Sequence, residues 1–428
     1  MQFKKKAQIS TAVGAAAILV ALSGCAANTT SGGGDGSRSL EITSWWTSGS
    51  EEAALNVLID AVKASDPGLT VNNFAVSGGG GANARQALAA RLQAGDPPDT
   101  WQIHPGGQLG GYVEAGQVAD LSALYAENDW ASQMTPAVAA LQSVDGKFYT
   151  VPIGVHRGNV LWTNPTVIAA AGVTIDESTT LDELIVELKA VKASGADAVC
   201  LGDKDVFASS ELLESLLMSR LGPDKWNGLF TNDTSFDSPE VRQALEDYTT
   251  FLSLANSDHT ALTWDEAAKN LAAGKCAVSL MGDWAYGEMV NAGFEPEKDF
   301  NWITLPSEFG DIFDYVGDGF SIPSSNIPNA AAAEKWLVAL MDPEVQVAFA
   351  AQKGTIPAIT TADISSLSAY QQGSADSFAN GLVVSTLTHG QASTAEFSQS
   401  YSDATTTFNG DLNIDAFIAT MTGAQASL

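Results

Sequence analysis

The chain has 428 residues, of which 45 % are hydrophobic and 16 % charged, and its formal net charge is -30 at pH 7. So much negative charge argues against nucleic acid as a partner and against binding to anionic lipid through charge. The apolar fraction indicates a folded body rather than a disordered acidic chain, and the length leaves room for two domains.

The N-terminal segment, residues 1–24, has the composition of a secretory signal. Three lysines at positions 4 to 6 are followed by an uncharged, mostly apolar or small run that ends at Leu22. This run is short for a transmembrane helix. The tetrad LSGC, which ends at Cys25, resembles the lipobox of bacterial lipoproteins and implies that Cys25 is lipidated and begins the mature chain. A plain signal peptide with a chance cysteine is the alternative.

Residues 25–39 are small and polar, and they predict a flexible tether. A lipid followed by a tether would hold the folded body at the extracellular face of the cytoplasmic membrane without spanning it. Two more cysteines, Cys200 and Cys276, would then lie in an oxidising compartment. They could form a disulfide, and two buried free thiols are the alternative.

The first part of the folded body predicts alternating strands and helices. The expected elements are strands over 40–46, 69–76 and 100–104 and helices over 51–64 and 83–94. Such alternation is typical of a parallel sheet covered by helices, in which ligands lie beyond the carboxyl ends of the strands. Trp46 and His104 occupy two such ends. Because neighbours in a strand point to opposite faces, Trp46 is expected at a cleft while Trp45 packs elsewhere. Ser50 is the candidate cap of the first helix.

Later segments are mainly helical. Helices are expected over 181–193, 239–255, 265–273, 330–341 and 343–352, and strands over 198–201 and 276–281. The four glycines at 78–81 lack the lysine and the spacing of a phosphate-binding loop, so a tight turn is expected there.

Several short motifs occur together along the chain. They are GDPPDTWQIH at 95–104, VPIGVHRGNVLW at 151–162, LGPDKWN at 221–227, GKCAVSLMGDWAYGEM at 274–289, QKGTIPA at 352–358 and STLTHG at 385–390. With the tryptophan pair, this set resembles the bacterial extracellular solute-binding proteins (family 1) of sugar ABC importers, and within them the glucose/mannose-binding branch. The resemblance covers about residues 40–428.

The resemblance implies an α/β fold of the periplasmic-binding-protein-like type II, with two lobes that close by a hinge on a ligand cleft between them. The first lobe would comprise residues 40–154 and 320–352, and the second 155–319 and 353–428. It further implies a monomer without cofactor or metal, which is not an enzyme. Such a protein captures a neutral sugar, above all glucose or a related monosaccharide, and delivers it to the membrane permease subunits.

A hexose has apolar faces and a rim of hydroxyls, so its site needs flat aromatic side chains together with charged and amide groups. The motifs assign to this site Trp46, Glu51, Gln102, His104, Trp264, Trp284, Asp318, Lys353 and His389. Trp45 is expected in the first lobe's core or at the edge of the cleft. The crossover residues His156, Arg157 and Asn159 are expected at the hinge. Glu52 stays open as an alternative to Glu51, because the loop before their helix is one residue longer than is usual in the family.

Two other functions use the same residue types. A secreted glycosidase would employ Glu51 and Asp318 as a carboxylate pair, but nothing in the sequence singles out a catalytic pair. A metal-binding lipoprotein would employ His104, His156 and His389 with an acid, and the number of tryptophans near these residues argues against it.

Overall fold

The computed structural model describes residues 38–428. The predicted signal peptide, Cys25 and nearly all of the predicted tether therefore lie outside the described residues. Ser39, the last residue of the predicted tether, is already the first residue of strand β1 (Ser39–Ser44). In the described part of the chain, no helix has both the length and the apolar character needed to cross a bilayer.

The first of two main sheets has six strands and contains the predicted alternation of strands and helices. Its strands are β1, β2 (Thr70–Ala75), β3 (Thr100–Ile103), β6 (Val151–Arg157), β11 (Ile312–Ser321) and β12 (Leu382–Ser385). β1 lies parallel to β2 and β3 on either side, whereas β11 runs antiparallel to β3 and β6 and parallel to β12. Helices α1 (Gly49–Ser65) and α2 (Ala82–Ala94) connect β1, β2 and β3, so the predicted βαβαβ unit is confirmed.

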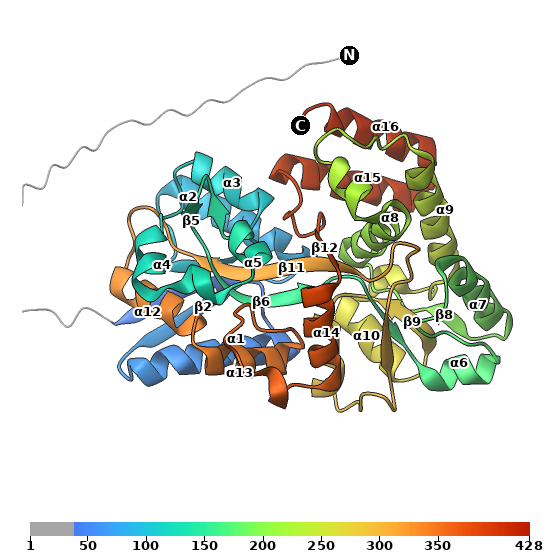
Figure 1. The fold of residues 1–428 in the computed structure, drawn as a ribbon, viewed down its shortest axis with the longest axis horizontal. Helices are drawn as coiled ribbons and strands as arrows, with labels where there is room; N and C mark the ends of the chain where they lie inside the picture. Colours follow the sequence, from blue (N-terminus) through green and yellow to red (C-terminus); the bar gives the residue numbers. More distant parts are fainter. Residues whose placement is uncertain (1–37) are drawn as a thin grey trace, which may run out of the picture. The chain divides into compact units, whose positions relative to one another are not determined.

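Helices from two distant parts of the chain cover this sheet. They are α1, α2, α3 (Gly107–Glu114), α4 (Ser122–Asn128), α5 (Pro136–Leu141), α12 (Ala330–Leu340) and α13 (Pro343–Lys353). α12 and α13, drawn in orange, return to pack against the blue α1 (Figure 1). Their core includes Leu58 of α1, Trp336 of α12 and Phe349 of α13, all of which are fully buried.

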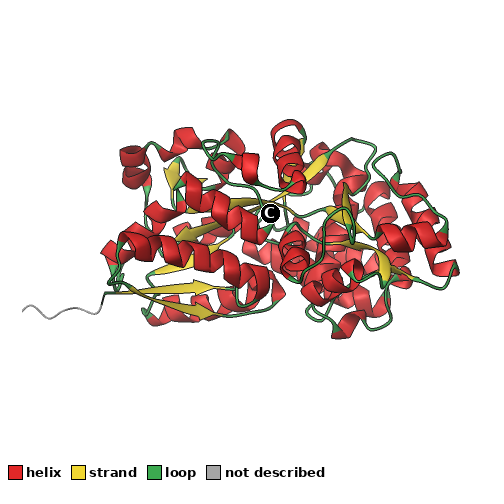
Figure 2. Cartoon of the chain, turned by 90° about the horizontal axis from the view of Figure 1, so that it is seen from below, coloured by secondary structure: helices red, strands yellow, loops and turns green. Residues whose placement is uncertain are grey.

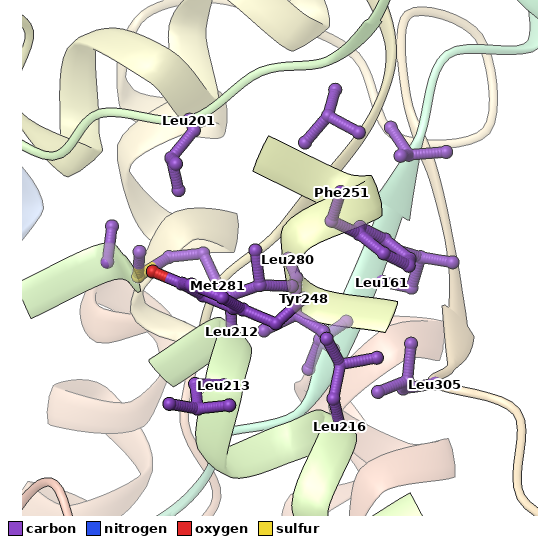
Figure 3. Close-up of a cluster of buried hydrophobic side chains, with 14 of the residues drawn as sticks. Leu161, Leu201, Leu212, Leu213, Leu216, Tyr248, Phe251, Leu280, Met281 and Leu305 are labelled. Carbon is purple, nitrogen blue, oxygen red and sulfur yellow. The ribbon is translucent and has the colours of Figure 1, made fainter. Parts of the chain in front are cut away.

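The second sheet has four strands and a core of its own. The strands are β7 (Val160–Thr163), β8 (Asp197–Val199), β9 (Cys276–Leu280) and β10 (Asn301–Thr304). Its surrounding helices are α6 (Pro165–Ala171), α7 (Leu181–Ala193), α8 (Phe207–Gly228), α9 (Pro239–Leu254), α10 (Trp264–Ala272), α11 (Trp284–Asn291), α14 (Ala369–Asn380), α15 (Ala395–Asp411) and α16 (Ile414–Gln425). Figure 3 shows leucines of β7, β9 and α8 meeting Tyr248 and Phe251 of α9 in this core.

Two sheets with separate cores give the two-lobe α/β architecture that the family resemblance implied. In Figure 2 the strands form two groups, each flanked by helices. The exact lobe bounds stay a prediction. β11 runs across the predicted boundary between 319 and 320, and β12, from the segment assigned to the second lobe, pairs with β11 in the first sheet.

Local sequence patterns predict most element bounds well. α7 has the predicted bounds, α9, α12 and α13 differ from them by one residue at one end, and α10 differs by one residue at both ends. The predicted cap of α1 is wrong, because the helix starts at Gly49 and its N-cap is Ser48. Ser50 instead donates from its backbone N–H and its hydroxyl to one carboxylate oxygen of Glu288, at 2.7 and 2.9 Å. A distant acid thereby satisfies a free N–H of the first turn.

Cys200 and Cys276 form a disulfide, with their Cα atoms 5.7 Å apart. Cys200 follows β8 and Cys276 begins β9, and both side chains are buried in the second core. The bond closes a loop across a sequence separation of 76 residues.

Replacing both cysteines, as Cys200→Ala/Cys276→Ala, is expected to lower the free energy of unfolding by about 3 kcal/mol, since the unfolded chain gains the freedom that the closed loop removes. Urea denaturation measures the difference. Dithiothreitol should lower the midpoint of the wild type and leave that of the double variant unchanged. Equal midpoints for oxidised wild type and double variant would contradict a disulfide in solution.

Candidate functional site

The carboxyl ends of β1 and β3 meet the start of α11 at a small cavity of about 70 Å³, here called the strand-end cavity. Eight of the nine residues predicted to bind ligand line it: Trp46, Glu51, His104, Trp264, Trp284, Asp318, Lys353 and His389. Trp45 and His156 line it too. The ninth predicted residue, Gln102, does not line the cavity but supports one that does.

Asp318 is the most heavily contacted of these groups. Gln102 donates from Nε2 to Oδ1 of Asp318 at 2.9 Å, and Nε2 of His156 lies 3.0 Å from Oδ2. Nδ1 of His104 lies 3.0 Å from the carbonyl oxygen of Gly317 and 3.4 Å from Oδ1 of Asp318. The side chain of Asp318 is buried, and it sits where the pairing of β11 with β6 shifts register. Three polar side chains, from β3, from the residue after it and from β6, thus converge on one carboxylate.

His156 connects Asp318 to a residue that sequence reasoning missed. Its Nδ1 lies 2.5 Å from Oδ1 of Asp283, whose Oδ2 accepts from the backbone N–H of Arg157 at 3.0 Å. Asp283 is the N-cap of α11, directly before Trp284. Its position inside the motif at 274–289 was a signal that could have been followed. The imidazole of His156 therefore bridges β11 and α11.

The ionisation of this cluster follows from its contacts. Burial alone would lower the pKa of His156, but the charges and hydrogen bonds of Asp283 and Asp318 outweigh it and raise that pKa to about 9. Burial would raise the pKa of Asp318, but the hydrogen bond from His156 and the nearby positive charges hold it well below its usual range. Burial lowers the pKa of His104 to about 4. At pH 7 the cluster holds an imidazolium, a carboxylate and a neutral imidazole.

A second ion pair lies across the cavity lining. Nζ of Lys353 contacts Oε1 of Glu51 at 2.5 Å and lies 5.5 Å from the ring centre of Trp46 and 5.8 Å from that of Trp284. Burial raises the pKa of Glu51, and Lys353 opposes that rise. Glu52 is exposed on the outer side of α1 and does not line the cavity.

The two adjacent tryptophans both reach the cavity. Trp46 is only 1 % exposed and packs against Phe320 and Phe349, with ring centres 6.1 and 5.2 Å away. Trp45 is 9 % exposed, and its ring centre lies 4.8 Å from that of His104. The alternation expected of a strand does not apply, because β1 ends at Ser44. Trp45 therefore stands at the cavity edge, while Trp46 is largely a core residue with one side on the cavity.

The remaining aromatic wall comes from the second part of the chain. Trp264 and Trp284 lie with ring centres 6.5 Å apart, and Trp284 lies 5.3 Å from the ring of His389. Phe207, at the start of α8, contacts both Trp284 and His389. Sequence reasoning did not single out Phe207.

The glycine turn closes one side of the cavity. Gly78 to Gly81 all have positive φ, from 52° to 104°, which only glycine adopts readily, so the predicted tight turn is confirmed. The backbone N–H of Gly79 donates to Oδ2 of Asp205 at 2.7 Å. A Cβ atom on Gly80 would lie 2.6 Å from the ring of Phe207. Asp205 and Phe207 are more than 120 residues away along the chain, and no local pattern indicates them.

The other two residues expected at the hinge point away from the cavity. Arg157 donates to Ser377, to Asp311 and to Oδ1 of Asn159, and Asn159 donates to the carbonyl of Ile312. Arg157 lines a different cavity of about 740 Å³, here called the back cavity, whose aromatic walls include Trp302. These contacts fix the start of β11.

A family model described as "Bacterial extracellular solute-binding protein" matches residues 46–347, which is most of the chain. The chain belongs to this family.

Similar proteins extend the match. An ABC transporter extracellular-binding protein of Pyrococcus horikoshii, itself uncharacterised, is 32 % identical, and the alignment covers 81 % of this chain and 78 % of that protein. A probable sugar-binding periplasmic protein of Rhizobium meliloti is 27 % identical over 90 % of this chain and 93 % of its own length. Among solved structures, a bacterial solute receptor with an exclusive preference for β-D-galactopyranose superposes with a TM-score of 0.78 at 17 % identity, covering 92 % of this chain and 98 % of that one.

The alternative hypothesis, a metal-binding protein, requires several metal-ligating side chains around one point. Within residues 38–428, no group of three or more histidine, cysteine or acidic side chains is arranged to hold a metal ion. His104, His156 and His389 all line the strand-end cavity, but they are engaged with Gly317 and Asp318, with Asp283 and Asp318, and with Glu211 and Thr386, respectively.

His156 gives the solute-binding protein a specific pH dependence. Its folded-state pKa of about 9 exceeds the unfolded value of about 6.5, so its contacts stabilise the fold fully below pH 6.5. This contribution is lost as the pH rises through 9, and it amounts to roughly 3 kcal/mol. We expect urea denaturation to show the free energy of unfolding falling over this pH range.

The matched control is His156→Gln, which keeps hydrogen-bonding groups but does not titrate. Its free energy of unfolding should be nearly flat between pH 6.5 and 9. The assignment fails if the variant shows the same slope as the wild type.

Proposed function

We propose that this chain is a substrate-binding lipoprotein that captures a neutral monosaccharide, glucose or a closely related pyranose, and hands it to the permease without chemical turnover. The observation that carries the proposal is the strand-end cavity, where tryptophans and paired charges meet. Trp284, Trp264 and Trp45 offer flat apolar faces, and Glu51, Asp318 and Lys353 offer charged groups. A pyranose ring presents matching C–H faces and hydroxyls.

The charge arrangement favours a neutral ligand. Lys353 is paired with Glu51, and the His156 imidazolium is paired with Asp283 and Asp318. Each of these cations and carboxylates therefore contacts a group of opposite charge, and the five together carry one net negative charge, which disfavours an anionic ligand. Sugar hydroxyls can still donate to the carboxylates, and hydrogen bonds to charged groups are the stronger kind.

The cavity is too small for a sugar as it stands, and this supports a motion that admits the ligand. A volume of about 70 Å³ is well below the roughly 300 Å³ at the lower end of ligand pockets. A sugar therefore enters only when the surrounding parts separate, and we propose hinge opening between the two lobes as that motion. The contacts from Gly79 to Asp205 and from Ser50 to Glu288 would break on opening and form again on closure.

Beyond Phe207 lies a groove of about 660 Å³, here called the outer groove. Gly79, Asp205 and Phe207 line both this groove and the strand-end cavity. A longer oligosaccharide would have to displace this wall to occupy both spaces. The wall therefore supports a monosaccharide over an oligosaccharide.

We further propose that a lipid on Cys25 anchors the protein to the membrane. Lipidation of Cys25 and the tether of residues 25–39 would keep the monomeric receptor at the extracellular face of the membrane, close to the permease. The tryptophan, acidic and lysine side chains of the cavity can bind and release a sugar without a catalytic step, and we propose that the protein does no more than this.

Calorimetric titration tests the function directly. Residues 38–428 are titrated with glucose, mannose, galactose, xylose, maltose and cellobiose, and we expect micromolar binding, about -8 kcal/mol, to one or two monosaccharides. Trp284→Ala should weaken that binding at least tenfold, because a buried aromatic anchor is removed.

Trp302→Ala is the matched control, since Trp302 lines the back cavity instead. Its affinity should equal that of the wild type. The proposal would be refuted if the folded wild type bound none of these sugars. It would also be refuted if Trp302→Ala weakened sugar binding while Trp284→Ala did not.

Asp205 tests closure separately from sugar contact. Its hydrogen bond with Gly79 would exist only in the closed protein, and Val206 beside it has a φ of 63°, which is costly for a β-branched residue. Asp205→Ala should speed sugar dissociation about fivefold, equivalent to one hydrogen bond, as followed by stopped-flow tryptophan fluorescence. The sugar-free free energy of unfolding should not change.

Asp205→Asn keeps an acceptor oxygen and should dissociate at close to the wild-type rate. A dissociation rate that is unaltered in Asp205→Ala would show that this contact does not hold the protein closed.

A further inference from the structure

Three carboxyl groups lie in the protein interior on the far side of His389 from the strand-end cavity. Glu211 and Glu214 are three residues apart on α8, Asp314 is on β11, and each is 0 % exposed. A Cβ atom on Gly158 would lie 2.1 Å from Oδ2 of Asp314 and 3.4 Å from Oε2 of Glu211, so these two carboxyl groups approach the same point. Three buried acids cannot all be ionised at such separations.

Glu214 has the contacts of the ionised member. Its Oε1 accepts from the hydroxyl of Thr386 at 2.6 Å, and its Oε2 accepts from the N–H groups of Leu387 and Thr388 at 2.9 and 2.5 Å and from the Thr388 hydroxyl at 2.7 Å. Four donors stabilise a negative charge. They also fix the segment that leads into His389.

Asp314 and Glu211 have the contacts of neutral acids. The carboxyl oxygens of Asp314 accept no hydrogen bond among the described residues. Burial, followed by the charge of Glu214 and a hydrogen bond with it, raises the pKa of Asp314 well above its usual value. Burial raises the pKa of Glu211 well above its usual value, and the charges of Glu214 and Asp314 add to that rise. A neutral Glu211 likewise carries a proton that needs an acceptor.

The acceptor beside Glu211 is His389. Oε1 of Glu211 lies 3.1 Å from Nδ1 of His389, within reach of a hydrogen bond once the acid carries a proton, and neither Glu211 oxygen makes a hydrogen bond in residues 38–428 of the structure as it stands. The hydroxyl of Thr386 lies 3.2 Å from the same nitrogen, but it already donates to Glu214. Burial lowers the pKa of His389 well below its usual value, so the ring is neutral and carries one hydrogen.

We propose that Glu211 is a positioning residue for His389. As a protonated acid it donates to Nδ1, which places the single ring hydrogen on Nε2, the nitrogen left to act towards the strand-end cavity. His389 is then a hydrogen-bond donor beside the acceptors Glu51 and Asp318. That His389 donates to the ligand rests on the proposed sugar-binding function. That its ring hydrogen is on Nε2 does not depend on that function.

Other charged and titratable groups around the ring are consistent with this role. After burial, His104, whose ring centre lies 4.7 Å from that of His389, most disfavours an imidazolium. Asp318 favours one, and Arg85 and His156 oppose it with smaller effects. The competing arrangement puts the hydrogen on Nδ1, which would donate to the Thr386 oxygen and leave Nε2 as an acceptor. The two arrangements give opposite hydrogen-bond polarity at the cavity.

Long-range ¹H–¹⁵N NMR of the protein labelled at histidine nitrogen distinguishes them without any sugar. The wild type and Glu211→Gln, whose amide can donate as the acid does, should both carry the hydrogen on Nε2 of His389. Glu211→Leu removes the donor and should move the hydrogen to Nδ1. A His389→Gln spectrum assigns the resonance.

A wild type with the hydrogen on Nδ1 would overturn the proposal, and so would a Glu211→Leu protein that keeps it on Nε2. D-Glucose and D-galactose then serve as binding probes at pH 7. Glu211→Leu should bind the better of the two at least tenfold more weakly than the wild type, with Glu211→Gln within about threefold. If neither sugar binds any of the three proteins, the proposed function fails, and the NMR result alone decides the role of Glu211.

Discussion

The buried carboxylate of Asp318 is the group on which the arrangement of the site depends. It is held by Gln102 and His156, and His156 in turn holds Asp283 at the start of α11. Through these contacts the strand ends of the first sheet are tied to the helix that carries Trp284. A buried charge is costly unless it is paired and hydrogen-bonded, so removing any member leaves another uncompensated. The other lining residues, including the ion pair of Glu51 and Lys353, surround the bridge that His156 forms between Asp318 and Asp283.

The site gains its order from groups that never reach the cavity. Glu214 fixes the segment before His389, and Glu211 lies against the back of the same ring. Phe349 and Phe320 hold Trp46 from behind. Side chains that are held in place before a ligand arrives lose little freedom on binding, and this preorganisation favours affinity in a small polar site. It also explains why so many polar groups of this chain are buried.

Sequence patterns could predict the elements and most of the lining, but not the contacts between distant segments. The hydrophobic periodicity of α7 and the alternation around β1 to β3 are local properties, so they survive in the structure. Asp205, Asp283 and Glu211 contact the site through partners more than 100 residues away, and Phe207 reaches Gly80 and His389 at such separations. Local patterns do not place one sheet against another. Ser50 fails as a cap for the same reason, since Glu288 supplies the acceptor from 238 residues away.

Sugar binding in the strand-end cavity is tested most directly by a crystal structure of this protein grown with the sugar that binds most tightly in calorimetry. We expect one pyranose ring in a strand-end cavity widened beyond its present volume of about 70 Å³, with a face on Trp284 and hydroxyls on Asp318 and Lys353, and the contact between Gly79 and Asp205 formed again around the sugar. A sugar bound in the back cavity or only in the outer groove, with the strand-end cavity empty, would contradict it.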